Sequence, residues 1–419
     1  MSKVAIIGAG ASGMMCAVTA AQRGCDVTVY EKNEKAGKKL FITGKGRCNL
    51  TNACDAADFF ENVISNPKFL YSAVYSFDSY AVMDFFEELG LPLKTERGNR
   101  VFPKSDRSSD VIKALTNRMK ELDVRLLLNE EVKDIVISDG VVKAVVSKLS
   151  GAFPKASPKD RKEDYDSVVI ATGGLSYPLT GACPDGYTFA KKAGHKINDT
   201  YPSLVSLTLK EKELSALTGL SLRNVTLKVT DGKKELYNGF GELLFTQTGI
   251  SGPLALTASA LCGKRIAKGE ELKAYIDLKS ALDKEKFDAR ILRDFEKNIN
   301  KDIQNALSGM FPFALIPFVL KNAGIDPAAK VHDINKAQRQ SLLETAKAFP
   351  MTITGTDGFE RAVVTGGGVD IKQVDPSSME SKLVHGLYFT GEVLDVDALT
   401  GGYNLQIAWS TGRLCGNCV

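Results

Sequence analysis

The sequence predicts an α/β protein in which one domain is built from both ends of the chain and is interrupted by an insertion. An apolar strand pattern, a glycine-rich turn and a helical pattern open the chain at residues 4–32, and strand patterns ending in glycine return at 167–174 and 386–412. Between about 201 and 356 the texture changes to alternating strand patterns and helical stripes. A chain of 419 residues is long enough for several domains, so the two textures indicate separate domains.

The composition is that of an ordinary folded protein, with 44% hydrophobic residues, 25% charged residues and a net charge of +4. No secretory signal pattern opens the chain, and the longest apolar run, residues 310–320, is shorter than the ~20 residues that a spanning helix needs. We therefore expect a cytoplasmic protein without membrane association. The eight cysteines are scattered, and CGNC at 415–418 lacks the further ligands of a zinc site, so reduced thiols and no metal site are expected.

Residues 4–32, VAIIGAGASGMMCAVTAAQRGCDVTVYEK, have the arrangement of a dinucleotide-binding βαβ unit. Gly8, Gly10 and Gly13 have GxGxxG spacing. The first glycine makes the tight turn, the second lets backbone approach a pyrophosphate, and the third lets the helix pack on the strand. Glu31 ends the second strand, where a carboxylate binds ribose hydroxyls and would repel the 2′-phosphate of NADP. The segment therefore predicts binding of NAD or FAD.

The remaining elements follow in chain order. Residues 32–53, rich in Gly, Lys and Asn, predict a long functional loop beside the cofactor. Apolar spacing predicts a helix over 108–122 behind a Ser/Asp cap. Further expectations are strands at 124–128, 132–138, 141–149, 167–170, 203–209, 224–230 and 349–356, turns at 139–140 and 231–232, a charged loop at 155–166, and helices at 284–308 and 335–348.

Several segments, taken in order, carry a resemblance to a known family: GKGRCNLTN (44–52), NRVFP (99–103), ATGG (171–174), TQTGISGP (246–253), VTGGGV (364–369) and GLYFTGEVLDVDALTGGYNLQIAWSTG (386–412). The chain resembles flavoproteins known as aminoacetone oxidase-like or bile-acid-pathway NAD(P)/FAD-dependent oxidoreductases, a family that includes a ribosomal RNA dihydrouridine synthase. The resemblance implies a Rossmann-like FAD-binding domain of the GR2 type, interrupted by a β-barrel-like domain that carries a helical domain. The expected boundaries are, in that order, 1–195 with 357–419, 196–262 with 349–356, and 263–348.

The resemblance also implies which residues hold FAD. The ADP half would be bound by the glycines of the opening turn with Ala11 and Glu31, and adenine by the backbone of Val132. The other expected cofactor residues are Ser12, Lys32, Gly44, Arg47, Cys48, Ala171, Thr172, Gly173, Gly391, Glu392, Asp395, Gly402, Tyr403, Asn404 and Gln406. A helix N-terminus near Gly402, aimed at the flavin, would stabilise the negative charge that reduction adds.

The expected reaction is hydride transfer between flavin and a substrate carbon. We expect a reductase of a C=C bond, with NAD(P)H as the electron source, acting on a small-molecule enone or steroid-like compound or on uridine in ribosomal RNA. Such a reaction needs a proton donor, and the candidates are Cys48, Arg47 and Tyr403. Tyr177 and His195 are weaker candidates, and His195 is expected at a helix end. Converging cations would lower the pKa of Cys48; the alternative is a structural thiol.

Three other functions stay open at this point. An amine or aminoketone oxidase would release peroxide. An RNA-binding flavoprotein without small-molecule turnover would use the basic clusters at 38–47, 97–107 and 155–162. A disulfide reductase would use Cys48 and Cys54, although no second GxGxxG follows for NADPH. The sequence leaves the oligomeric state open.

Overall fold

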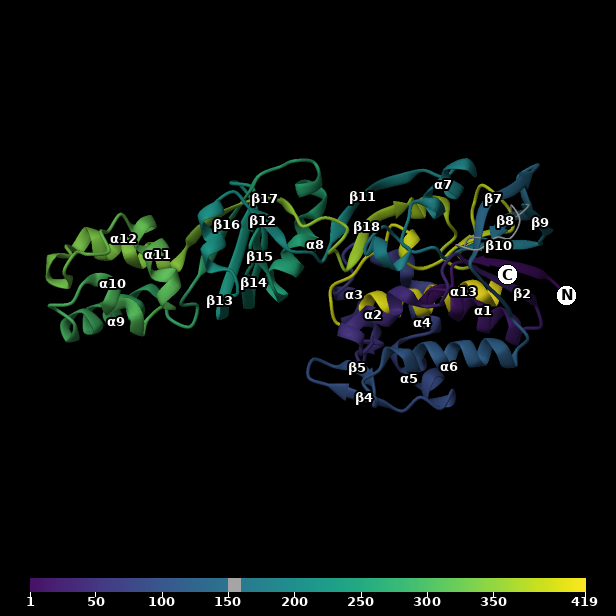
Figure 1. Cartoon of the computed structure of the whole chain (residues 1–419), viewed down its shortest axis with the longest axis horizontal. Coiled ribbons are helices and arrows are strands. Elements are labelled where there is room, and N and C mark those ends of the chain that lie inside the picture. Colours follow the sequence, from purple (N-terminus) through teal and green to yellow (C-terminus); the bar gives the residue numbers. More distant parts are fainter. Residues whose placement is uncertain (150–159) are drawn as a thin grey trace. The chain divides into compact units, whose positions relative to one another are not determined.

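The computed structural model describes residues 1–149 and 160–419, which divide into two compact units (Figure 1). Unit 1 consists of Met1–Tyr201 and Val363–Val419, and unit 2 is Pro202–Ala362. The predicted domain with an insertion is therefore confirmed. The insertion begins a few residues later than expected, because strand β11 (Ile197–Ser203) starts within unit 1 and pairs there with β18 (Val364–Val369).

Five parallel strands form the central sheet of unit 1, in the order β19, β10, β1, β2 and β6. They are β1 (Lys3–Ile7), β2 (Asp26–Glu31), β6 (Arg125–Leu128), β10 (Ser167–Ile170) and β19 (Leu387–Phe389). The middle strands are almost wholly buried, as expected for parallel strands covered on both faces. Parallel neighbours end at the same edge, so the glycine-rich turns after β1, β10 and β19 meet there.

Helices α1 (Ala11–Gln22) and α13 (Tyr403–Cys418) pack side by side in unit 1 (Figure 1). Glycines on α13 permit this approach: a Cβ on Gly412 would lie 2.4 Å from the Ser12 carbonyl oxygen, and one on Gly416 would lie 2.7 Å from the Cys16 carbonyl oxygen. Because the contact advances along both helices in the same direction, the helices are parallel. Their N-termini therefore lie at the same end, toward the carboxyl edge of the sheet.

Smaller elements complete unit 1. Its other helices are α2 (Lys38–Gly46), α3 (Ala56–Glu61), α4 (Tyr71–Ser76), α5 (Ser79–Glu88), α6 (Ser108–Glu121) and α7 (Asp185–Lys192). Two antiparallel sheets contain β3 (Thr51–Asn52), β4 (Leu93–Glu96) and β5 (Arg100–Pro103), and β7 (Glu130–Ser138), β8 (Val141–Leu149) and β9 (Arg161–Asp164). The predicted turn between β7 and β8 is confirmed, with positive φ at Asp139 and Gly140.

Unit 2 combines a closed barrel with a group of helices. The barrel strands are β12 (Leu207–Leu209), β13 (Ser221–Thr230), β14 (Glu235–Phe245), β15 (Gly249–Ser251), β16 (Leu272–Asp277) and β17 (Phe349–Thr356). The helices are α8 (Pro253–Ala267), α9 (Lys284–Lys297), α10 (Ile303–Ala306), α11 (Ile316–Ala323) and α12 (Lys336–Lys347). Figure 1 shows α9 to α12 grouped together beside the barrel. Strand β16 closes the barrel, although residues 263–348 are expected to be helical.

Four local expectations need correction. The helix predicted over 284–308 is interrupted after Lys297, and Ile299 is 51% exposed, because a spacing of four residues drifts around a helix of 3.6 residues per turn. Helix α6 has Arg107 rather than a Ser/Asp residue at its N-cap position. Residues 32–53, predicted as a loop, contain the short helix α2, which is kinked at Thr43–Lys45. Residues 161–164 form strand β9, and the rest of the predicted basic loop at 155–159 lies outside the described residues.

Among the described helices, none combines the length and apolar character that crossing a bilayer requires.

Candidate functional site

The carboxyl edge of the central sheet is shaped by glycines that exclude side chains. Gly8 has a φ of 108°, and a Cβ there would lie 2.6 Å from the Ala171 carbonyl oxygen. A Cβ on Gly13 would lie 2.0 Å from the Gly8 carbonyl oxygen. These two glycines therefore let β1, β10 and α1 approach one another at the level of the backbone. The close packing at Gly13 and the positive φ at Gly8 agree with the packing and the tight turn that the GxGxxG spacing predicts for them.

Gly10 is different, because its surroundings are open. A Cβ built on Gly10 has no described atom within 4 Å. Gly10 is the N-cap residue of α1, and no side chain of the described residues caps this helix. The first-turn N–H groups of α1, from Ala11 to Gly13, are therefore left without a side-chain cap, with the positive end of the helix dipole behind them. Such a helix start binds phosphate groups.

Glu31 is held as a fixed carboxylate at the end of β2. It is 9% exposed. Its Oε2 accepts a hydrogen bond from the Ala9 N–H at 3.1 Å, and its Oε1 accepts from the Asn33 N–H at 2.9 Å and from Asn33 Nδ2 at 2.7 Å. Asn33 is therefore a positioning residue that the GxGxxG pattern does not reveal. The carboxylate stands next to the glycine turn, where the sequence predicts the ribose.

A polar network joins four segments at the same edge. Lys39 Nζ on α2 lies 2.6 Å from Glu392 Oε2 and donates to Ser176 Oγ at 2.6 Å. Glu392 Oε1 accepts from Ser176 Oγ at 2.9 Å and from the Thr365 N–H at 2.8 Å. The lysine and glutamate side chains are 28% and 21% exposed, so the pair is partly shielded from water. Ser176 and Thr365 were not among the predicted residues, although both stand beside glycine-rich strand ends.

The backbone at the start of α13 is fixed by packing, and no side chain of the described residues caps this helix. Gly402 has a φ of 107°, and a Cβ there would lie 2.4 Å from the Thr51 carbonyl oxygen. Asn404 binds the backbone of Ala398 through both ends of its amide, at 2.9 Å and 2.7 Å. Gln406 is fully buried, and its amide accepts from Thr51 Oγ1 at 2.6 Å and donates to the Phe77 carbonyl oxygen at 2.9 Å. The side-chain amides of Asn404 and Gln406 are therefore engaged by neighbouring segments of the fold, and their predicted place around the cofactor stays a prediction.

The cations near Cys48 do not converge on its sulfur. Lys39 pairs with Glu392, and the Arg47 guanidinium pairs with Glu96 and Asp106 and lies 4.1 Å from the centre of the Phe102 ring. Cys48 is fully buried, and burial raises its pKa to about 12. The expectation of an activated thiolate is therefore wrong for this geometry. Desolvation disfavours the charged form, so the structural alternative holds for Cys48.

The Cys48 and Cys54 thiols have separate partners, which disfavours the disulfide reductase. Thr43 hydrogen-bonds the first thiol, and Ser79 hydrogen-bonds the second. Burial raises the pKa of Cys54 to about 11. Both thiols therefore stay protonated at neutral pH, unlike the reactive thiol of a redox pair.

Tyr403, the first residue of α13, is half-buried, and its ring centre lies 6.0 Å from that of Phe59. Burial raises the pKa of its phenol. By contrast, His195 is buried behind the sheet edge, where its Nε2 lies 2.7 Å from Ser381 Oγ and its ring packs edge-on against Phe389. Burial lowers the pKa of His195 to about 4. The predicted helix-end position of His195 is confirmed, since it follows α7.

The other predicted cofactor residues are distributed as follows. Ala171, Thr172 and Gly173 follow β10 at the sheet edge, with Gly173 at a φ of 73°. Gly391 follows β19, and its N–H donates to Thr411 Oγ1 at 3.0 Å. Asp395 accepts a hydrogen bond from Asn198 at 2.8 Å, and Ser12 donates one to the Thr390 carbonyl oxygen at 3.5 Å. Val132 is buried in β7. Gly44 lies in the kink of α2, and Lys32 contacts Cys183.

FAD, the cofactor implied by the sequence, fits this edge. The open helix start at Gly10 suits a pyrophosphate, and the fixed Glu31 carboxylate suits ribose hydroxyls. Within the described residues, the fully buried Thr390 Oγ1 at the end of β19 has no hydrogen-bond partner, which leaves a polar group for a ligand.

The family described as HI0933-like protein Rossmann domain matches residues 2–418. The chain belongs to the HI0933-like family. It is 32% identical to the 3-dehydro-bile acid delta(4,6)-reductase of Clostridium scindens, over 99% of this chain and 98% of the relative. It is 31% identical to the ribosomal RNA dihydrouridine synthase of Haemophilus influenzae, over 98% of this chain and 96% of the relative. The family resemblance predicted from the sequence is thus confirmed.

A solved structure shares the HI0933-like fold. The 3-ketosteroid-delta4-(5alpha)-dehydrogenase of Rhodococcus jostii RHA1 has a TM-score of 0.51 and 15% identity, covering 99% of this chain and 97% of that one. The family and the fold together place the HI0933-like chain among the FAD-dependent oxidoreductases. The predicted fold class and enzyme class are confirmed.

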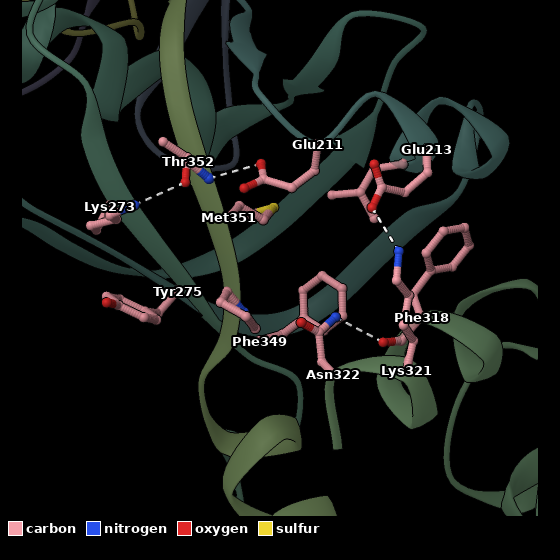
Figure 2. A pocket seen from close by; sticks show the side chains of 12 residues that line it. Glu211, Glu213, Lys273, Tyr275, Phe318, Lys321, Asn322, Phe349, Met351 and Thr352 are labelled. Carbon is pink, nitrogen blue, oxygen red and sulfur yellow. Dashed lines mark hydrogen bonds and ion pairs between the residues drawn. The ribbon is translucent and has the colours of Figure 1, made fainter. Parts of the chain in front are cut away.

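Unit 2 contains a separate cavity of about 260 Å³ between the barrel and α11 (Figure 2). None of the predicted site residues lines it. Its charged side chains are already paired: Glu213 with Lys321 at 3.1 Å, Glu211 with the Thr352 N–H at 2.9 Å, and Lys273 with Thr352 Oγ1 at 3.3 Å. Because the predicted site residues lie in unit 1, the chemistry is assigned to that unit and not to this cavity.

Proposed function

We propose that this HI0933-like chain reduces a C=C bond that is conjugated to a carbonyl group. One observation carries the proposal: the two curated relatives, each matching nearly the whole chain, are named for the same type of chemistry. A delta(4,6)-reductase acting on a 3-keto steroid saturates a bond conjugated to the ketone. Dihydrouridine is uridine with its ring C=C bond saturated, and that bond is conjugated to a ring carbonyl.

The shared reaction adds a hydride to the carbon β to the carbonyl group and a proton to the α carbon. When bound, FAD supplies the hydride, and NAD(P)H is the proposed source of electrons. In the proposed site, the first turn of α1 beside Gly10 binds the pyrophosphate and Glu31 orients the ribose. The positive end of the α13 dipole, at Gly402, favours negative charge near it. These groups bind and orient, and they do not themselves react.

Tyr403 is the proposed proton donor. Its phenol lies on the first turn of α13, it is half-buried, and its raised pKa keeps the proton on the oxygen at neutral pH. Arg47 is a proposed positioning residue, because Glu96, Asp106 and Phe102 fix its guanidinium at one place beside the same glycine-rich segment. Cys48 has no proposed role in proton transfer, since its thiol is sealed in the core.

The test is anaerobic stopped-flow spectroscopy of the chemically reduced holoprotein. We expect a dienone steroid or a uridine-containing ribosomal RNA fragment to reoxidise the flavin faster than dioxygen does, and the two arms distinguish the substrate sources. NADPH or NADH should bleach the flavin under the same conditions. Rapid stoichiometric peroxide formation with an aminoketone, and indifference to enones and RNA, would overturn the proposal in favour of an oxidase.

The role of Tyr403 has its own test. Tyr403→Phe keeps the ring but removes the proton, so reoxidation by the enone should slow at least tenfold, which is about 1.4 kcal/mol of barrier. Reduction of the flavin by NAD(P)H should be unchanged. Tyr80→Phe, at a tyrosine of unit 1 that is 51% exposed, makes the same chemical change and is the matched control, with both rates expected to stay unchanged. An unchanged rate in Tyr403→Phe would assign the proton to solvent or another residue.

A further inference from the structure

A lysine, a cysteine and an aspartate that the reaction does not use meet beside the end of β2. Lys32 follows the ribose carboxylate Glu31 directly, and Cys183 precedes α7, whose first residue is Asp185. Lys32 Nζ lies 2.6 Å from Cys183 Sγ, and Cys183 Sγ lies 2.8 Å from Asp185 Oδ2. Lys32 Nζ is also 3.6 Å from Asp185 Oδ2. The three side chains are partly exposed, so small molecules in solution reach them.

The nitrogen to sulfur distance is the notable feature. A hydrogen bond from nitrogen to oxygen has a usual length of about 2.9 Å, and sulfur is the larger atom. The amine and the thiol are therefore pressed closer together than a hydrogen bond requires. One bridging oxygen atom would span this separation without moving either backbone.

Neighbouring residues of the same chain fix this contact. It joins two segments that are far apart in the sequence. Asn33 Nδ2 lies 3.4 Å from the Thr180 carbonyl oxygen. Gly181 has a φ of 97°, which favours glycine, and a Cβ there would lie 2.4 Å from Asn33 Nδ2 and displace the Asn33 side chain. Asn33 also holds Glu31. The loop that carries Cys183 is thus docked onto the residues that position the ribose carboxylate.

We propose that Lys32 and Cys183 form an oxygen-bridged covalent cross-link, Nζ–O–Sγ, when the protein is exposed to dioxygen. The thiol and the neutral amine each give up two electrons, and dioxygen takes up all four. One oxygen atom stays in the bridge. The other leaves as water with the thiol proton and one amine proton, so atoms and electrons balance. Asp185 is placed to accept the thiol proton first.

The cross-link depends on protonation in a stated direction. Burial and the neighbouring Asp185 raise the pKa of Cys183 more than Lys32 lowers it. Burial lowers the pKa of Lys32, but the contacts with Cys183 and Asp185 outweigh it, and the net direction is upward. Both groups are therefore protonated at neutral pH. Cross-linking should become faster as the pH rises, because the thiolate and the neutral amine are the reacting forms.

The bridge would fasten the Cys183 loop to the end of β2 beside Glu31. We therefore expect FAD to leave the cross-linked holoprotein several-fold more slowly than it leaves the holoprotein without the cross-link. A reductant such as dithiothreitol cleaves the sulfur–oxygen bond and should restore the original release rate. The site would thus couple retention of the cofactor to the redox state of the surroundings.

The experiment compares intact holoprotein purified without oxygen with the same protein kept in oxygen-saturated buffer. We expect a mass gain of one oxygen atom less two hydrogen atoms, reversed by dithiothreitol, and a proteolytic fragment joining Lys32 to Cys183. Cys183→Ser and Lys32→Arg should both abolish the gain, whereas Cys418→Ser, at an exposed cysteine, should not.

Other outcomes overturn the proposal. A mass gain of whole oxygen atoms on Cys183 without a joined fragment would show ordinary thiol oxidation. A loss of two hydrogen atoms without added oxygen would show a direct sulfur–nitrogen bond or a disulfide. Unchanged mass and an intact Cys183 thiol, labelled by a maleimide after oxygen treatment at alkaline pH, would show that the close contact is unreactive.

Discussion

Helices α1 and α13 of unit 1 both have a glycine at the N-cap position, but the two glycines lie in different surroundings. At α1, Gly10 faces open space and no side chain of the described residues caps the helix. At α13, Gly402 is pressed against the backbone of Thr51, and the amides of Asn404 and Gln406 are tied to neighbouring segments. No side chain of the described residues caps either helix, but the backbone at Gly402 is fixed by packing whereas Gly10 is open. A glycine before a helix therefore serves close backbone packing in one case and open space in the other.

The largest expected effect on stability comes from adding a side chain at Gly402, at the start of α13. Gly402→Ala forces a side chain into left-handed backbone and against the Thr51 carbonyl group, so unfolding should become easier by about 3 kcal/mol. Urea denaturation of the apoprotein measures this. Gly90→Ala is the matched control, because Gly90 also has a positive φ but has no described atom within 4 Å of its Cβ position, and it should lose about 1 kcal/mol. Equal losses would contradict the packing role.

Strand β19, which precedes the α13 segment, gives a separate pH test of packing in unit 1. His195 packs against Phe389 on β19 and has a folded pKa of about 4, below the usual 6.5. Between these values the unfolded chain binds more protons than the folded one, so stability is lost as the pH falls through this window. From pH 7 to pH 5 the loss should be about 2 kcal/mol.

Substitution checks the assignment to His195. His195→Gln should flatten the pH dependence of the free energy of unfolding, whatever its effect at pH 7. His385→Gln, at a histidine whose side chain is 78% exposed and lies 2.8 Å from Glu380, should change the slope less than His195→Gln does. If His385→Gln flattens the slope and His195→Gln does not, the burial argument fails.

The polar network around Glu392 tests whether the contact between α2 and the segment after β19 stabilises the fold. Lys39→Met leaves a partly buried carboxylate without its cation and should reduce the stability of the apoprotein by about 1–2 kcal/mol. Lys38→Met removes a lysine that pairs with the exposed Glu34, and the loss should stay below about 0.5 kcal/mol. Thermal unfolding of both variants measures the contrast, and equal shifts in melting temperature would show that the network contributes little.

The smallest effect on stability, and the sharpest test of the comparison, is expected at the open helix start. Gly10→Ala should change the free energy of unfolding of the apoprotein by less than about 1 kcal/mol, since its Cβ meets no described atom. FAD binding, measured by titration of the apoprotein, should weaken at least tenfold, or about 1.4 kcal/mol. A variant that is strongly destabilised yet binds FAD normally would reverse the roles given to the two helix starts.

The sequence predicts the backbone of the site better than its side chains. Gly8, Gly13 and Glu31 lie where the GxGxxG spacing places them, because strand, turn and helix geometry are local properties of the chain. The interruption of the domain is also visible, because glycine-ended apolar strands and alternating strands differ in pattern. Both features are encoded by residues close together in the sequence.

Side-chain roles depend on partners that are distant in the chain. Cations near Cys48 in the sequence suggest an activated thiol. In the structure Lys39 pairs with Glu392, and Arg47 pairs with Glu96 and Asp106. Gln406 and Asn404 stand in a glycine-rich segment typical of cofactor contacts, yet Thr51, Phe77 and Ala398 occupy their amides. A single sequence does not show which of two polar groups forms the hydrogen bond or ion pair with a given partner.

The order of strands in the central sheet has a consequence for synthesis of the chain. Strand β10 is complete once residue 170 has left the ribosome, but its outer neighbour β19 begins only at residue 387. Until then the edge of β10 is unpaired, while the whole of unit 2 is made. Unpaired apolar edges promote aggregation. Nascent chains of this protein should therefore need shelter by chaperones until the last thirty or so residues emerge, and C-terminal truncations should aggregate rather than fold into a smaller enzyme.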